Sequence, residues 1–332
     1  ENMQHLTQLN TFGLMSEAEH FVSVRTVEEL KQLPGLIAQH QRYLILGGGS
    51  NVVLAQTVYG LVIHNQLKGI ELIQETDTDY LVQAYAGEVW HEFVQHCIHQ
   101  GWCGLENMAL IPGSVGAAPV QNIGAYGLEL KDYFDSLQAF NLRTGEWREF
   151  SREDCRFAYR DSVFKHEAKD YLIVSIRMRL PKVWQAKLNY ADLKNYAGLS
   201  ERSSAQEIFD AVCVIRQAKL PDPKVLGNAG SFFKNPLVSA EQYEQLNSTF
   251  PGLVAYPQDD GRYKLAAGWL IDQCGWKGKD LGHAGVHAKQ ALVLVNRGGA
   301  TAADIRALAQ AIQADVRARY AVELEPEPIF VE

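Results

Sequence analysis

Apolar residues in the first half of the chain fall into short runs separated by polar and glycine-containing stretches. Such runs, rich in Val, Ile, Leu, Phe and Tyr, predict buried or half-buried strands, and they lie at 43–46, 60–64, 80–86, 134–141 and 171–180. The first of them is apolar throughout and predicts a fully buried strand. Helical patterns are fewer: a capping box at Thr26 and Glu29 opens a helix to about residue 41, and another is predicted over 89–100. The mixture predicts an α+β fold.

The second half of the chain carries mainly helical patterns. The stretch 181–200 is polar and weakly periodic, which indicates a boundary. Beyond it one strand is predicted at 290–295, and helices are predicted at 204–219, 239–249, 265–274 and 301–320. Pro221 and Pro223 stop the first of these helices, because proline cannot continue a helical hydrogen-bond ladder.

Composition places the chain among ordinary globular proteins. It has 332 residues, of which 47% are hydrophobic and 21% charged. This length predicts about two domains, each large enough to bury its own core. The composition disfavours disorder, collagen and coiled coil. The net charge is 31 − 39 = −8, which argues against a general nucleic-acid or anionic-membrane surface. Nothing in the pattern requires more than a monomer.

Several features together predict a cytoplasmic protein. No apolar run approaches the ~20 residues that span a bilayer, and Glu1–His5 lacks the basic and apolar blocks of a secretory signal. The five cysteines are scattered and never spaced C-x-x-C, which disfavours a disulfide framework and a structural zinc site. His91 and His96 resemble a zinc-protease helix, but they are five residues apart where chelation needs four. No metal is therefore expected.

Two glycine-rich tracts are the first candidates for a binding site. Three glycines precede Ser50 and Asn51 directly after a predicted strand, a pattern that suits either a tight turn or a cradle of backbone N–H groups for phosphate. It lacks the third glycine of a dinucleotide fingerprint and is followed by strand-like residues, which disfavours a Rossmann fold. The tract 111–127 is long, apolar and rich in small residues, as expected of a loop against a flat cofactor or of a buried, well-packed loop.

Three polar positions are candidates for chemistry, each with a structural alternative. Ser231 lies between Gly230 and two phenylalanines, a setting that suits a proton donor beside a dry aromatic wall, or a turn or helix cap. Arg160 next to Asp161 is typical of a structural ion pair. Glu325 and Glu327 alternate with proline near the C-terminal strand and could be surface residues.

Taken in order, these tracts resemble one family, the UDP-N-acetylenolpyruvoylglucosamine reductases of bacterial peptidoglycan synthesis. Each motif alone is weak, but eight in the same order are specific, and they extend from about residue 10 to residue 327. The matching tracts are Leu46–Asn51, Gly104–Asn107, Ile111–Gly127, Tyr159–Ser162, Lys219–Lys224, Gly227–Pro236, Lys264–Asp272 and Leu324–Glu327.

The resemblance implies an α+β fold with a FAD-binding domain of the vanillyl-alcohol-oxidase/p-cresol-methylhydroxylase type. Its first subdomain would cover 1–67, joined by a C-terminal strand at about 321–332. The second would cover 68–200, and a separate α+β substrate domain 201–320. Segments from near the two ends of the chain would therefore meet.

The resemblance also implies a two-stage reaction with non-covalent FAD as cofactor and NADPH as co-substrate. NADPH reduces the flavin, and flavin N5 then passes a hydride to the terminal vinyl carbon of the enolpyruvyl sugar nucleotide, giving UDP-N-acetylmuramate for cell-wall biogenesis. Arg160 would fix the substrate carboxylate, Glu327 would polarise it, and Ser231 would protonate the adjacent carbon. Developing enolate charge explains why a cation and an acid are needed.

Further residues are assigned by the same match. The flavin would be held by Gly47, Gly48, Gly49, Ser50, Asn51, Ser114, Gly116, Gln121, Asn122, Gly124 and Ala125. The substrate would be held by Tyr126, Tyr190, Lys219, Asn235, Tyr256 and Gln290. Tyr190 and Tyr256 fit the branch of the family in which a tyrosine-bearing loop closes over the substrate.

The chain departs from the family pattern at Pro328, where an aliphatic strand residue is usual, so Glu325 remains an alternative to Glu327. Two other functions stay open: a flavin oxidase of the same fold with another substrate, and a sugar-nucleotide-binding protein without catalysis. The motifs in the substrate domain disfavour the first, and the joint presence of Arg160, Ser231 and Glu327 disfavours the second.

Overall fold

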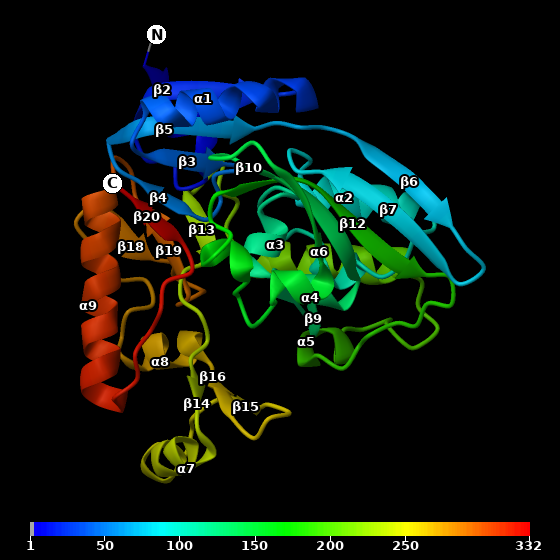
Figure 1. Cartoon of the computed structure of the whole chain (residues 1–332). Coiled ribbons are helices and arrows are strands. Elements are labelled where there is room, and N and C mark those ends of the chain that lie inside the picture. The colour runs from blue at the N-terminus through cyan, green and yellow to red at the C-terminus, as the bar shows by residue number, and fades with distance from the viewer. Residues whose placement is uncertain (1–2) are drawn as a thin grey trace. The chain divides into compact units, whose positions relative to one another are not determined.

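The computed structural model describes residues 3–332; Glu1 and Asn2, the start of the N-terminal stretch considered above, lie outside the described residues (Figure 1). The chain forms two compact units. Unit 1 contains residues 3–4, Ala18–Gly49 and Tyr59–Ala218, and unit 2 contains His5–Glu17, Ser50–Val58 and Lys219–Glu332. The three-part division expected from the sequence stays a prediction.

A five-stranded antiparallel sheet forms the larger part of unit 1. Its order is β11-β10-β12-β7-β6, with bounds β6 Ile70–Glu75, β7 Asp79–Tyr85, β10 Phe134–Asn141, β11 Trp147–Ser151 and β12 Tyr171–Pro181. The predicted strands at 80–86, 134–141 and 171–180 are confirmed. The strands β6 and β11 were not predicted, because each is polar on the face that is left exposed.

Two helices cover this sheet (Figure 1). Apolar residues of α2, Trp90–His99, and of α6, Ala205–Lys219, share one core with β7, β10 and β12. Both helices were predicted within a residue or two of their bounds. The α2 residue His91 stacks on Phe209 of α6 at a centroid distance of 5.2 Å, and its Nδ1 accepts a hydrogen bond from the backbone N–H of Leu110 at 2.9 Å. His91 therefore has a packing role.

A second sheet in unit 1 has the order β1-β2-β5-β3, with β3 parallel to β5. Its strands are β1 Gln4–His5, β2 Glu17–Val24, β3 Tyr43–Leu46 and β5 Thr57–Asn65. The prediction of a fully buried β3 was wrong, because only Leu46 is buried. The helix predicted over 26–41 is divided into a 3₁₀ helix, Val27–Gln32, and α1, Leu33–Gln39; Pro34 begins α1 because it lacks the N–H that a continuous helix would need there.

The tract 101–127, which includes the loop predicted at 111–127, contains short regular elements. These are a 3₁₀ helix, Glu106–Met108, the helix α3, Ala118–Gln121, and the strand β8, Gly124–Ala125, which pairs with β9, Leu128–Glu129. Elements this short carry too little periodicity to be recognised. The remaining helices of unit 1 are α4, Arg152–Cys155, and α5, Ala191–Lys194.

Unit 2 combines two small antiparallel sheets with three helices. The sheet β13-β19-β18-β17 consists of Asn228–Ser231, Val293–Asn296, Ala284–Val286 and Asp280–Leu281, and the sheet β14-β16-β15 of Leu237–Val238, Tyr263–Leu265 and Ala255–Pro257. The helices are α7 Ala240–Thr249, α8 Ala267–Gln273 and α9 Ala302–Tyr320, all close to their predicted bounds. The predicted strand 290–295 starts later, at Val293, because Gln290 begins a turn in which its carbonyl accepts from the Val293 N–H at 3.0 Å.

Segments from near both ends of the sequence pair in unit 2. The strand β20, Ile329–Val331, runs parallel to β4, Val52–Leu54, and Figure 1 shows the two side by side next to α9. The ladder begins where the Ile329 N–H donates to the Asn51 carbonyl at 2.9 Å. Pro328, which has no N–H, therefore stands just before the first residue that must donate. None of the helices within residues 3–332 is long and apolar enough to cross a membrane.

The environment of His91 predicts a pH-dependent stability. Burial lowers the pKa of His91 below its usual 6.5, so as pH falls below about 6.5 the unfolded chain takes up this proton before the folded chain does, and stability is lost. Asn can replace the Nδ1 acceptor without titrating. We expect the loss of stability between pH 7 and pH 5 to be smaller in His91→Asn than in the parent protein, measured as the urea midpoint at each pH. Parallel curves would contradict the assignment.

Candidate active site

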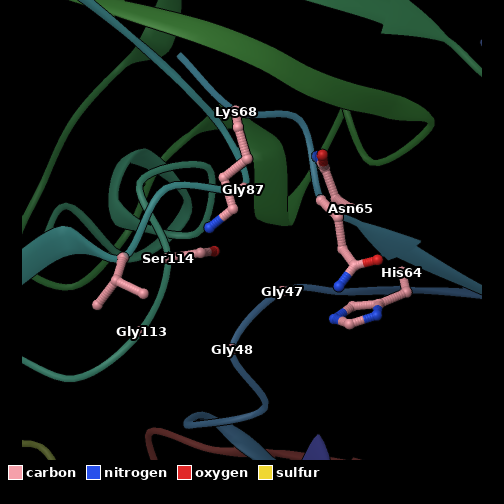
Figure 2. Close-up of a pocket in the computed structure, with 10 residues that line it drawn as sticks. Gly47, Gly48, His64, Asn65, Lys68, Gly87, Gly113 and Ser114 are labelled. Atoms are coloured by element: carbon pink, nitrogen blue, oxygen red, sulfur yellow. The ribbon is translucent and has the colours of Figure 1, made fainter. Parts of the chain in front are cut away.

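A pocket of about 300 Å³ in unit 1 brings the two glycine-rich tracts together (Figure 2). Gly47 and Gly48 from the turn after β3 line it, together with Gly113 and Ser114 from the tract 111–127. The sequence suggested each tract separately, and the structure places them in one wall. The sequence analysis missed the residues that complete the lining: His64, Asn65, Gln66, Lys68, Gly87 and Val89.

The glycines of this pocket are required by close approach of two backbones. A Cβ added to Gly47 would lie 2.4 Å from the Ser114 Oγ, and one on Gly48 would lie 3.3 Å from the Gly113 Cα. Gly87 has even less room, since its Cβ would lie 2.5 Å from the carbonyl carbon of Gln66. At Gly47, Gly48 and Gly87 the pocket wall is therefore backbone, and its polar groups there are peptide N–H and C=O groups.

Positive charge lies at this pocket in an otherwise acidic protein. Figure 2 shows the Lys68 side chain extending toward the space between Ser114 and Gly47. Burial lowers the pKa of His64, and the charges of Arg25 and Lys68 lower it further, while a backbone hydrogen bond at Gly47 partly opposes this. His64 is therefore a neutral imidazole at neutral pH, and Lys68 is the cation that lines the pocket.

Arg160 is held rigidly in unit 1. Its guanidinium donates to the carbonyls of Asn122 at 3.3 Å and Gly124 at 3.0 Å and lies over the Tyr159 ring. Asp161 contacts the His166 ring nitrogen at 2.9 Å, and the ion pair expected between Arg160 and Asp161 stays a prediction. Arg160 also has a left-handed backbone, with φ of 49°, a conformation that costs energy in a non-glycine residue and is common at functional sites.

The predicted flavin-binding residues of the tract 111–127 differ in what their side chains can do. The Asn122 side chain is fully used inside the protein: its Nδ2 donates to Glu129 and the Ala158 carbonyl, and its Oδ1 accepts from the Lys131 N–H. Gln121, at the end of α3, is buried and accepts from the Lys165 ammonium at 2.8 Å. The remaining members, Gly116, Gly124 and Ala125, offer only backbone.

Arg216 of α6 is a cation near Arg160 that the sequence analysis did not identify. Burial lowers its pKa, a hydrogen bond to the Tyr126 side chain opposes that shift, and the charge of Arg160 adds to it. Its Nε is buried without a hydrogen-bond partner. Arg160 and Arg216 are close enough to interact electrostatically, and the Arg216 Nε–H is an unused hydrogen-bond donor. Such a pair of cations can bind an anion. The helical pattern of α6 could not reveal this, because arginine is common on helix surfaces.

Tyr126 and Tyr190, both assigned to substrate by resemblance, meet in unit 1. Their rings are T-shaped, with centroids 5.5 Å apart. Tyr126 has a left-handed backbone with φ of 50°, and Tyr190 is exposed and precedes α5. Tyr126 thus contacts both Tyr190 and Arg216.

In unit 2, Ser231 ends β13 and is exposed. The expectation of an aromatic wall around its hydroxyl was wrong. Phe232 and Phe233 are fully buried in the core of unit 2, where Phe232 packs against Phe12 and Phe330. The two rings therefore anchor the strand and leave the serine at its exposed end. Among the described residues, no group forms a hydrogen bond with the Ser231 hydroxyl.

The structure distinguishes the two candidate glutamates near the C-terminal strand. Phe233 bridges to Pro326, and the Glu327 N–H donates to the Phe232 carbonyl at 2.8 Å, so Glu327 lies next to the residue that follows Ser231. Glu325 is exposed and forms an ion pair with Lys234 at 3.0 Å. Asn51 donates to the Glu327 carbonyl at 3.3 Å, which links the predicted flavin-binding turn to this segment within unit 2.

The other predicted substrate residues lie at separate places in unit 2. Lys219 is exposed at the end of α6, and Tyr256 is exposed in β15. Asn235 is half-buried, and its Oδ1 accepts from the Ala267 N–H at the start of α8. Gln290 is half-buried in the turn before β19. Of the predicted flavin residues not yet described, Ser50 is half-buried before β4. Gly49, at the end of the turn in unit 1, has φ of 66°.

Comparison with known proteins identifies these features as those of a flavin-binding enzyme class. Residues 18–151 match the family of FAD binding domains, and residues 222–331 match the C-terminal domain of UDP-N-acetylenolpyruvoylglucosamine reductase. A crystal structure of UDP-N-acetylenolpyruvylglucosamine reductase from Thermus caldophilus aligns with a TM-score of 0.70 and 25% identity, covering 100% of this chain and 98% of that one. The predicted α+β fold with a FAD-binding domain is confirmed.

Sequence relatives define the family. The UDP-N-acetylenolpyruvoylglucosamine reductase of Bordetella pertussis is 57% identical over 330 residues, covering 99% of this chain and 94% of its own length. The reductase of Burkholderia vietnamiensis is 52% identical over 328 residues, covering 96% of this chain and 93% of its own length. The chain belongs to the UDP-N-acetylenolpyruvoylglucosamine reductase family, as its motifs indicated.

The residues of the pocket fit FAD. A wall of backbone at Gly47, Gly48 and Gly113, with no free space for a Cβ at Gly47 and little at Gly48, suits a diphosphate or a flat ring, and Lys68 supplies positive charge for a dianionic diphosphate. This explains how a chain of net charge −8 can hold an anionic dinucleotide.

The close approach at Gly47 predicts a specific rescue. Gly47→Ala places a methyl group against the Ser114 Oγ, and overpacking of this kind typically costs about 1–3 kcal/mol. Ser114→Ala removes that oxygen, and the nearest atom to the new methyl group is then the Cβ of residue 114, at 3.3 Å. We expect Gly47→Ala to lower the thermal midpoint, Ser114→Ala to change it little, and the double variant to recover much of the loss. Additive losses would show that the contact is not the cause.

Proposed function

We propose that this protein catalyses the NADPH-dependent, FAD-mediated reduction of UDP-N-acetyl-3-O-enolpyruvylglucosamine to UDP-N-acetylmuramate in peptidoglycan precursor synthesis. The observation that carries the proposal is the 57% identity to a UDP-N-acetylenolpyruvoylglucosamine reductase over 99% of the chain, because the similarity extends over nearly the whole length of both proteins. A monomer acting in the cytoplasm and the division into subdomains 1–67 and 68–200 and a substrate domain 201–320 are part of the proposal.

Bound FAD supplies the redox chemistry, accepting a hydride from NADPH and providing one for the vinyl carbon of the substrate. Its diphosphate would be held by the turn Gly47–Asn51 and by Lys68. Ser114 and the backbone of 116–125 would hold the ring system. Backbone and fixed side chains need no reorganisation when charge moves, which is the property that electrostatic catalysis requires.

In this proposal the Arg160 guanidinium binds the carboxylate of the substrate. Hydride addition to the vinyl carbon turns the enolpyruvyl carboxylate into an enolate-like dianion, so a fixed cation stabilises the transition state more than the ground state. Two carbonyls orient the Arg160 guanidinium, and Arg216 adds a second positive charge close by. Tyr126, Tyr190, Lys219, Asn235, Tyr256 and Gln290 would bind the remainder of the sugar nucleotide.

Ser231 delivers the proton. Its exposed hydroxyl at the end of β13 has no partner among the described residues, so it is available to a bound substrate. A serine hydroxyl is a weak acid, but the carbon that it would protonate is a strong base. Glu327, whose N–H donates to the Phe232 carbonyl, would polarise the carboxylate, and it does so best when it is protonated or shares a proton with that carboxylate.

The two half-reactions test the function and the acid separately. The purified protein should be yellow, anaerobic NADPH should bleach it, and the enolpyruvyl substrate should restore the colour. In Ser231→Ala we expect bleaching at the parent rate and substrate-dependent reoxidation slower by about 10²–10⁴, followed by stopped-flow absorbance. Equal damage to both half-reactions would reject Ser231 as the acid. Rapid reoxidation by oxygen with no response to the substrate would identify an oxidase instead.

The two glutamates form a matched pair of variants. Glu327→Gln should slow reoxidation by the enolpyruvyl substrate by about 10²-fold or more, because the amide cannot share a proton with the carboxylate. Glu325→Gln removes only an exposed ion pair with Lys234 and should leave both half-reactions unchanged. The same stopped-flow traces decide the matter, and a larger defect in Glu325→Gln would reverse the assignment.

A further inference from the structure

An extended segment before Tyr190 is attached to unit 1 by apolar packing and by hydrogen bonds to only two side chains. Residues 183–189 form no strand, and within the described part of the chain they make no hydrogen bond between backbone groups. Trp184, Ala186 and Leu188 pack against the core of unit 1, while the residues between them are exposed. This alternation is that of a strand without a partner.

Neighbouring residues in one 3₁₀ helix provide the attachment. The carboxylate of Glu106 accepts a short hydrogen bond from the Trp184 indole N–H and a second, at 2.7 Å, from the Gly104 N–H. The Asn107 side chain donates to the Lys187 carbonyl at 2.9 Å. These are the only hydrogen bonds of 183–189 in residues 3–332. Both anchor residues are buried, with Glu106 2% and Asn107 0% exposed.

Asn107 also holds the other tyrosine. The same amide nitrogen donates to the Tyr126 carbonyl at 3.0 Å, so one side chain binds two backbone segments that lie 61 residues apart in sequence, counted as 187 − 126. Its Oδ1 is buried without a partner, a cost that an apolar residue of similar size would avoid. An asparagine that served only to fill space would not carry this cost.

We infer that Asn107, with Glu106, is a positioning residue that sets Tyr190 against Tyr126 by tying segment 183–189 to the Tyr126 backbone. The inference rests on the proposed role of the two tyrosines in substrate binding. It assigns no contact with substrate to Asn107. Asn107 acts by placing Tyr190, because segment 183–189 before Tyr190 is not part of any sheet.

Three variants separate this role from general stability. Asn107→Asp keeps the shape but replaces the donor with an acceptor that faces two carbonyls. Trp184→Phe removes the indole N–H and part of the ring, and it carries the same tests if Asn107→Asp does not fold. Gln185→Ala is the matched control, because this side chain is exposed on the same segment.

The first measurement is independent of activity. Trypsin cleaves after lysine, and the carbonyl at Lys187 is the group that Asn107 holds. We expect limited digestion after Lys187 to be about tenfold faster in Asn107→Asp than in the parent protein or Gln185→Ala, relative to cleavage after Lys169. Cleavage at the parent rate in both Asn107→Asp and Trp184→Phe would overturn the inference. This comparison remains valid if the enolpyruvyl compound proves not to be the substrate.

The second measurement tests the link to substrate. In Asn107→Asp we expect the KM for the enolpyruvyl substrate to rise about tenfold, while the rate of bleaching by NADPH stays within twofold of the parent. Tyr190→Ala should raise the KM as well, and adding Asn107→Asp to it should give no further rise, since residues acting through one another are not additive. Unchanged KM, or KM effects that multiply in the double variant, would overturn the positioning role.

Discussion

Close approach of two backbones is the constraint on which the pocket of unit 1 depends. The turn after β3 and the loop around Gly113 lie so near one another that neither Gly47 nor Gly48 has normal room for a Cβ. A wall built this way presents peptide groups at fixed positions, without side chains that must be ordered. It also makes the pocket a property of two tracts that are 66 residues apart, counted as 113 − 47, so that neither tract is a site alone.

Around Arg160 the protein stores backbone strain. Asn122, Tyr126 and Arg160 all have left-handed conformations, with φ of 45°, 50° and 49°. Each is compensated nearby: Asn122 by its saturated side chain, Tyr126 by Asn107, and Arg160 by its hydrogen bonds to the carbonyls of Asn122 and Gly124. Strain of this kind persists where the surroundings fix the geometry, and here it fixes the Arg160 guanidinium over the Tyr159 ring.

Much of the fold could be predicted from local pattern, and much of the site only from motif order. Long strands such as β10 can be predicted from the apolar pattern. The helix α9 can be predicted from its periodicity, and Thr301 and Asp304 form the capping box at its start. The helix after Thr26 was misjudged because Pro34 interrupts it. Lys68 and Arg216 were missed because an isolated cation carries no local signal, and only the folded chain brings it to a pocket or to Arg160. Likewise, Phe232 and Phe233 follow Ser231 in the sequence and suggested a lining for its hydroxyl, but tertiary packing buries both rings in the core of unit 2.

The parallel pairing of β20 with β4 has a consequence for the order in which the chain can fold. Every strand of the five-stranded sheet of unit 1 precedes residue 182, so that sheet has all its partners while synthesis continues. The β4 segment, by contrast, must wait for residues 329–331 before its ladder exists. An interval therefore separates the two events, during which an apolar segment with unpaired edges is open to incorrect pairing or to chaperones.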